Sequence, residues 1–83
     1  MTTKTTKTAT FVLYHVWGTR GQFMLRLAYR GYCVAEKPDQ GQATLRELWS
    51  VAQAQGFTHA LYEDDRGRRA RMPLNRFYNR YCV

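Results

Sequence analysis

Residues 22–36, with the sequence QFMLRLAYRGYCVAE, decide the fold of this chain, because they fit either β-strands or a helix. As a strand, the first half of the segment alternates between two faces. One face carries Phe23, Leu25, Leu27 and Tyr29, and the other carries Met24, Arg26, Ala28 and Arg30. As a helix, the segment would begin at a capping box of Thr19 and Gln22 and end at Gly31.

The flanking residues favour the strand. Residues 18–21 (GTRG) separate two apolar runs, as a hairpin loop does, and residues 32–35 continue in side chains typical of strands. We therefore expect β structure throughout this region. In that arrangement Arg26 and Arg30 would stand side by side on one exposed face.

Upstream, residues 9–17 (ATFVLYHVW) are β-branched and aromatic, with apolar side chains on both faces, which is typical of a central strand. Residues 1–8 contain only threonine and lysine after Met1, so we expect a flexible tail. Lys4 and Lys7 could lie on phosphates as a basic arm, although a plain flexible terminus is the simpler interpretation. Residues 9–83 should form one small domain.

Downstream, residues 44–56 carry the strongest helical pattern. Thr44 and Glu47 have the spacing of a capping box, and Gly56 is expected to end the helix, with Phe57 folding back on its last turn. The apolar stripe consists of Leu45, Leu48, Trp49 and Ala52. We expect this helix to pack on one face of the sheet.

Residues 57–63 and 68–72 are predicted to form a hairpin, with Arg66 and Gly67 as a two-residue loop. The expected cross-strand pairs are then Asp65 with Arg68 and Asp64 with Arg69. Residues 74–81 follow with a second helical stripe. Its members are Leu74, Phe77, Tyr78 and Tyr81, and it leaves Arg76 and Arg80 one turn apart on another side.

Together these segments predict an α+β domain with a small, mostly antiparallel sheet. The expected order is ββ(β)αββ with a short C-terminal helix, and one main helix packs on one sheet face.

The charge distribution points to a binding role. The 83 residues contain 13 lysines and arginines against 6 acids, a net charge of +7, which favours partners with negative surfaces. Residues 66–83 contribute six arginines and neither an acid nor a lysine. A domain of this size also leaves little room for an enclosed active site.

Residues able to carry chemistry form no recognisable pattern. The consecutive acids at 63–65 point in alternating directions and cannot converge on one ion. His15 and His59 fall on different predicted strands, without metal-ligand spacing. Cys33 has no neighbouring base to activate it as a nucleophile. We therefore expect a protein that is not an enzyme and binds neither metal nor cofactor.

Cys33 and Cys82 are the only cysteines, and their spacing leaves a single disulfide between them possible. Reduced thiols are the favoured interpretation, because the chain shows no apolar signal segment and no stretch long enough to span a membrane. These features predict a cytoplasmic protein without a membrane partner. The oligomeric state is left open, including a homodimer.

The candidate binding residues are Arg66, Arg69, Arg71, Arg76, Arg80, Tyr78 and Tyr81, with Arg26 and Arg30 as reinforcement. Arginine forms bidentate contacts with phosphate or carboxylate, and tyrosine can stack on bases or anchor an interface. Tyr78 and Tyr81 share the stripe expected to face the core, so packing is the favoured role for both.

These residues predict a small, non-enzymatic, basic protein that engages nucleic acid or a nucleoprotein assembly through an arginine-rich C-terminal surface. The alternative is a small inhibitor or adaptor that blocks a larger machine by occupying an acidic protein surface. A phage-encoded inhibitor of a host defence complex, such as an anti-CRISPR, is an example. Size and composition are typical of small proteins from mobile genetic elements, although no motif supports that likeness.

Overall fold

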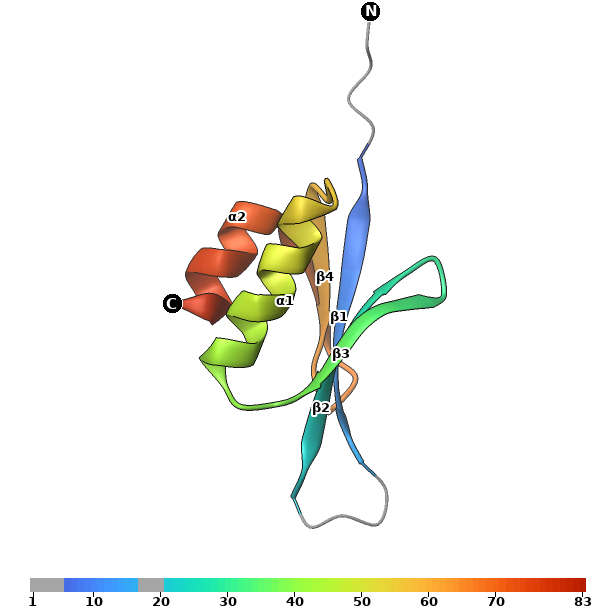
Figure 1. The fold of residues 1–83 in the computed structure, drawn as a ribbon, viewed down its shortest axis with the longest axis vertical. Coiled ribbons are helices and arrows are strands. Elements are labelled where there is room, and N and C mark those ends of the chain that lie inside the picture. Colours follow the sequence, from blue (N-terminus) through green and yellow to red (C-terminus); the bar gives the residue numbers. More distant parts are fainter. Residues whose placement is uncertain (1–5, 17–20) are drawn as a thin grey trace, which may run out of the picture.

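The computed structural model describes residues 6–16 and 21–83, and confirms the α+β class (Figure 1). The elements are β1 (Thr8–His15), β2 (Phe23–Tyr29), β3 (Tyr32–Pro38), α1 (Gln42–Ala54), β4 (His59–Glu63), β5 (Arg69–Pro73), α2 (Leu74–Phe77) and the π-helical turn η1 (Tyr78–Cys82). The sheet order is β3-β2-β1-β4-β5, and only β1 with β4 is a parallel pair. The mostly antiparallel sheet is therefore confirmed.

The segment that decided the fold is a hairpin of β2 and β3, as predicted. Arg30 and Gly31 form its two-residue turn, with φ angles of 50° and 82°. Positive φ at both turn residues matches the right-handed twist of the strands. The expected position of Arg30 beside Arg26 on a strand face is wrong, because Arg30 lies in the turn itself.

The core lies between one face of the sheet and the helices. Phe11, Leu25, Leu27 and Ala60 line the sheet side, and Leu48, Ala52, Leu74, Phe77 and Cys82 line the helical side. Figure 1 shows α1 and α2 on the same side of the strands. The predicted stripes of both helical segments therefore face the core, and the opposite face of the sheet carries no helix of the described chain.

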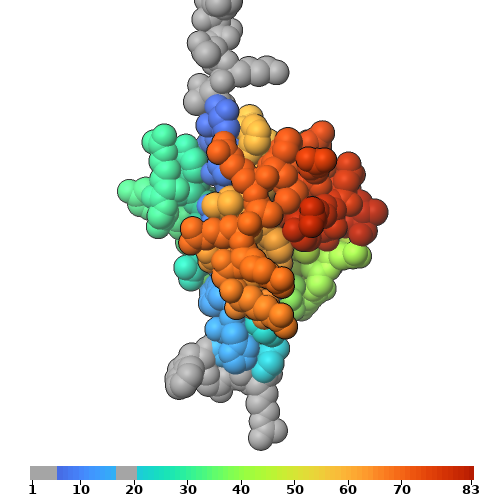
Figure 2. Space-filling model, turned by 180° about the vertical axis from the view of Figure 1, so that it is seen from behind, coloured from blue at the N-terminus to red at the C-terminus, as the bar shows by residue number. Residues whose placement is uncertain are grey.

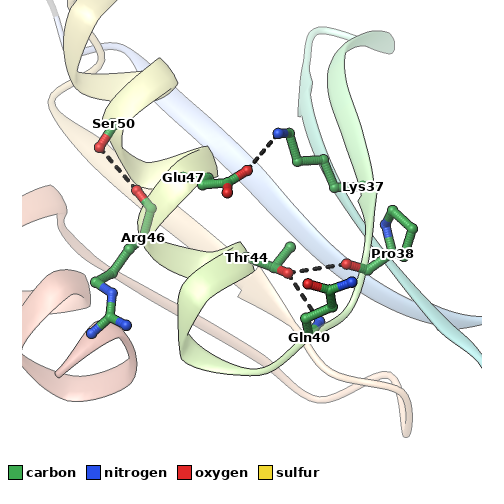
Figure 3. A network of polar contacts seen from close by, with 7 residues as sticks. All are labelled: Lys37, Pro38, Gln40, Thr44, Arg46, Glu47 and Ser50. Atoms are coloured by element: carbon green, nitrogen blue, oxygen red, sulfur yellow. Dashed lines mark hydrogen bonds and ion pairs between the residues drawn. The ribbon is translucent and has the colours of Figure 1, made fainter.

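The first turn of α1 differs from the prediction. The helix begins at Gln42, and Thr44 is buried inside it, so the expected capping box does not form. The Thr44 hydroxyl donates to the Pro38 carbonyl oxygen at 3.0 Å and accepts the Gln40 N–H at 2.9 Å. Glu47, the other half of the expected box, forms an ion pair with Lys37 of β3 (Figure 3). Both side chains fasten α1 to β3 instead of capping α1.

The last turn of α1 forms as predicted. Gly56 has φ 82°, its N–H donates to the Gln53 carbonyl at 3.1 Å, and the Phe57 N–H donates to the Ala52 carbonyl at 3.1 Å. This pair of bonds is a Schellman motif. The Lys7 ammonium adds a third contact, because it donates to the Gln55 carbonyl at 3.0 Å.

The described chain begins at Thr6, and Lys7 and Thr8, which the sequence placed in the tail, are bonded to the fold. Lys7 donates its backbone N–H to the Thr58 hydroxyl at 3.0 Å, and Thr8 is the first residue of β1. Trp17 and most of the predicted loop at 18–21 lie outside the described residues. Within residues 6–16 and 21–83, no helix is long and apolar enough to cross a membrane.

Candidate functional site

The β4–β5 hairpin has a different register from the predicted one. Glu63 is the cross-strand partner of Arg69, so the expected pairing of Asp64 with Arg69 is wrong by one residue. Asp64 instead closes a longer loop, in which its backbone N–H donates to the Arg68 carbonyl at 3.0 Å. One Asp64 carboxylate oxygen accepts the N–H groups of Arg66 and Arg68, both at 2.9 Å. These side-chain bonds favour the longer loop over the two-residue turn.

Arg68 and Arg69 both form ion pairs, although not with the predicted partners. The Nε atom of Arg68 lies 3.1 Å from Asp64, and the Nε atom of Arg69 lies 2.6 Å from Glu63. The hydrogen bonds from the backbone of Arg68, from the backbone of Arg66 and from the Arg68 side chain hold the pKa of Asp64 below its usual value. Each pair uses the Nε atom of its arginine, whereas a guanidinium offers five N–H donors. Both side chains are more than half exposed, which leaves the outer donors accessible.

Tyr78 and Tyr81 pack inward. The Tyr78 ring lies 4.6 Å from the Trp49 ring, and the Tyr81 ring lies 4.6 Å from that of Tyr62 and 5.2 Å from that of Phe77. Both tyrosines are only partly exposed and pack against the core. Base stacking needs a free ring face, so these side chains serve packing first.

The remaining C-terminal arginines are exposed. Arg66 lies in the hairpin loop, Arg71 on β5, Arg76 on α2 and Arg80 on η1. None of the four forms an ion pair with any residue of the described ranges. We call the exposed arginines between positions 66 and 80 the arginine surface; it comprises Arg66, Arg68, Arg69, Arg71, Arg76 and Arg80.

A shallow pocket of about 350 Å³ lies between the β4–β5 hairpin and η1, and arginines from both segments line it. Figure 2 shows the hairpin in orange beside the C-terminal segment in red. The pocket is lined by Tyr62, Asp64, Arg68, Arg69, Ala70, Arg80 and Tyr81. The one acid in this lining already accepts bonds from Arg66 and Arg68, and burial raises the pKa of Tyr62, which keeps its phenol neutral. Arg68 and Arg69 are paired with Asp64 and Glu63, and Arg80 has no ion-pair partner among the described residues, so the site keeps a net positive charge.

Arg26 and Arg30 do not join the arginine surface. Arg26 stands on β2 and pairs with Glu36 of β3 at 2.7 Å. The Arg30 guanidinium lies 5.3 Å from the centre of the Tyr29 ring, at the tip of the β2–β3 hairpin. Figure 1 shows that this tip projects from the side of the sheet opposite α2. Arg30 is therefore separated from the C-terminal site, and two strands, β1 and β4, lie between Arg26 and Arg69.

Both cysteines are free thiols: Cys33 is exposed and Cys82 is buried. Burial raises the pKa of the Cys82 thiol to about 11. No group of three or more histidines, cysteines or acids in the described parts of the chain is arranged to hold a metal ion.

Sequence reasoning missed one arrangement of charged residues on the helix-free face of the sheet. Arg26 of β2 and Glu63 of β4 flank Val12 of β1, because both are register partners of Val12. The signal was absent from the local sequence, since the parallel pairing of β1 with β4 joins segments about 50 residues apart in the chain. Only the strand order brings these residues into one row.

Comparison of the chain with family models, with curated proteins and with solved structures finds no match. The function is therefore inferred from the site itself.

Proposed function

We propose that this protein is a non-enzymatic, cytoplasmic binding protein whose arginine surface engages the phosphate backbone of nucleic acid, alone or within a nucleoprotein assembly. The observation that carries the proposal is the pocket whose lining includes Arg68, Arg69 and Arg80 and a single acid, Asp64, whose oxygens are already engaged. Two free thiols support a reducing compartment.

Recognition through this surface is expected to depend on backbone charge and not on base sequence. Guanidinium groups bind phosphate oxygens in a planar, bidentate geometry. Tyr78 and Tyr81 contribute partly buried rings that hold η1 in place, which leaves the arginines to make the contacts. Phosphate contacts position a protein on nucleic acid without reading its sequence.

A second candidate is a small inhibitor or adaptor that binds an acidic surface of a larger protein. The inward packing of Tyr78 and Tyr81 favours it, because a surface without free aromatic rings presents guanidinium groups that fit carboxylates as well as phosphates. An inhibitor of a host defence complex, encoded by a phage or another mobile element, is an example of such a protein.

The two candidates differ in their response to free nucleic acid. Fluorescence anisotropy with three duplexes of unrelated sequence should give similar affinities for the wild-type protein at low salt. Substitution Arg80→Gln should weaken binding about tenfold on all three, because a hydrogen bond to a charged group contributes about 1.5 kcal/mol or more.

Arg30→Asn is the matched control. It removes the same charge from the distant hairpin tip, and asparagine tolerates the positive φ at that position. Equal losses in Arg80→Gln and Arg30→Asn would mean that total charge, and not the arginine surface, determines binding. If no duplex or single strand binds, while a partner protein is retained at fixed stoichiometry after nuclease treatment, the inhibitor candidate replaces the leading one.

A further inference from the structure

The helix-free face of the sheet, which we call the open face, has apolar residues at its centre. Strand alternation places Val12, Met24, Ala28 and Leu61 on this face, opposite the core residues. All four are only partly exposed, and none belongs to the described residues that form the core or pack on it. A sheet face of this composition is suited to cover by another protein surface.

One row of side chains crosses all five strands of the open face. In sheet order the row is Glu36, Arg26, Val12, Glu63 and Arg69. Two ion pairs form its ends, Arg26 with Glu36 at 2.7 Å and Arg69 with Glu63 at 2.6 Å. The charges along the row are therefore minus, plus, neutral, minus and plus. Reversing the row exchanges every plus for a minus.

This antisymmetry makes the open face complementary to itself. Consider a two-fold axis that runs parallel to β1 above Val12. Rotation about this axis places a second copy face to face with the first, with the residues of its row in reverse order. Glu36 then faces Arg69 of the second copy, and Arg26 faces Glu63 of the second copy. Val12 faces its own equivalent at the centre. An axis along the row would instead oppose like charges, which is unfavourable.

The next row along the strands fits the same axis. In sheet order this row consists of Cys33, Ala28, Thr10, Leu61 and Arg71. At its ends the rotation sets Arg71 against Cys33 of the second copy, without a charge partner, and the fit lies in the three central residues. The same rotation sets the large side chain of Leu61 against the small Ala28 of the second copy, and Thr10 against its equivalent. Apolar contacts of matched volume would lie beside the charged row, as in a face-to-face packing of two sheets.

From these two rows we propose that the open face is a homodimer interface, in which two copies pack sheet on sheet about a two-fold axis parallel to β1. Each of the four charged residues of the row gains a second partner of opposite charge across the interface. The interface takes up Arg69 and Arg71 of the arginine surface, which lie on the open face, but the proposal does not depend on the phosphate-binding role. Arg76 and Arg80 belong to the helical layer on the other side of the sheet and stay exposed in the dimer.

Sedimentation analysis at protein concentrations from about 1 µM to about 1 mM tests the proposal. This range covers weak to moderate dimer affinities. The wild-type protein should pass from the monomer mass to twice that mass within this range. The variant Glu36→Lys/Glu63→Lys carries an all-positive row, and Arg26→Glu/Arg69→Glu carries an all-negative row. Each should stay monomeric alone, and an equimolar mixture should form a heterodimer.

Surface ion pairs contribute little to stability, but each double variant also sets like charges opposite one another across the strands, so circular dichroism first checks that both variants keep the wild-type spectrum. If either variant unfolds, Val12→Lys takes its place, because a charge at the centre of the row faces its own equivalent and should abolish dimerisation. A wild-type protein that stays monomeric throughout overturns the proposal. So do folded charge variants that still form homodimers, and so does a mixture that stays monomeric.

Discussion

The indole nitrogen of Trp49 donates a hydrogen bond to the Leu74 carbonyl oxygen at 2.9 Å. This bond joins α1 to the first residue of α2 and so fixes the start of the segment that carries Arg76 and Arg80. Two more side chains of α1 donate hydrogen bonds to the C-terminal end of the same segment. Gln42 donates to the Val83 carbonyl at 2.7 Å, and Arg46 donates to the Cys82 carbonyl at 3.2 Å. The long helix therefore holds the segment with Arg76 and Arg80 in position.

Replacement of Trp49 by phenylalanine should destabilise the protein by about 1–3 kcal/mol. The substitution removes the donor and leaves the Leu74 carbonyl without its partner, and it also shrinks the contact with the Tyr78 ring. Urea denaturation measures the change. Gln53→Ala, at an exposed position of the same helix, should stay within about 0.5 kcal/mol of wild type. A Trp49→Phe variant as stable as the control would contradict the anchoring role.

Gly56→Ala should cost about 1–2 kcal/mol, because an L-residue is strained in the left-handed conformation. A Cβ atom at this position would meet nothing within 4 Å, so the cost comes from the backbone alone. Gln55→Ala changes the preceding residue, whose φ of −89° is an ordinary value, and should be nearly neutral. Equal stabilities of the two variants in urea would rule out the Schellman end of α1.

The two thiols should differ in reactivity. Cys33 is exposed, whereas Cys82 is fully buried with a pKa raised to about 11. A thiol reagent at pH 8 should therefore modify one cysteine in the native protein and two after denaturation. Mass spectrometry of the labelled peptides identifies the site. Rapid labelling of Cys82 in the folded protein, or a disulfide between the two cysteines, would be inconsistent with the structure.

Asp64 should contribute to acid sensitivity. Its pKa is lowered in the folded protein, so its contribution is fully present above its unfolded pKa of about 3.9 and is lost as the pH falls through the lowered folded value. Asp64→Asn should thus reduce the urea midpoint at pH 7, and the difference from wild type should shrink towards pH 2. Asp65→Asn removes the same charge from the same loop. A difference that stays constant down to pH 2, or an identical profile for the two variants, would refute this role.

The sequence predicted the elements that depend on local signals. The apolar stripe and Gly56 identified α1 to within two residues at each end, and the loop-like flanks of residues 22–36 correctly favoured strands over a helix. Local periodicity and glycine placement carry this information, because both act within a single turn of the chain.

The sequence-based predictions were wrong where one side chain had two competing hydrogen-bond partners. Thr44 was expected to cap α1 but bonds to Pro38 and Gln40, because β3 passes close to the first turn. Asp64 was expected to face Arg69 but closes the loop through backbone donors, which shifts the hairpin register by one residue. Neither set of hydrogen-bond partners can be predicted without knowing the position of the neighbouring strand.

The candidate site was predictable only in part. The arginines of residues 66–80 were identified from composition, and the inward packing of Tyr78 and Tyr81 followed from their helical spacing. The separation of Arg30 from that surface and the charged row on the open face both depend on strand order. The sequence of β1 or of β4 alone does not identify the strand with which it pairs.

The central claim is that the arginine surface binds phosphates, and the salt dependence of duplex DNA affinity tests it most directly. For the wild-type protein, log K should fall linearly with log salt, with a slope of about −3 to −5, since each phosphate contact contributes about −0.9. Arg76→Gln/Arg80→Gln should reduce the magnitude of that slope by about 2, or about 1 per arginine, equally on every sequence. An affinity that does not respond to salt, or a slope that the double variant leaves unchanged, would contradict the claim.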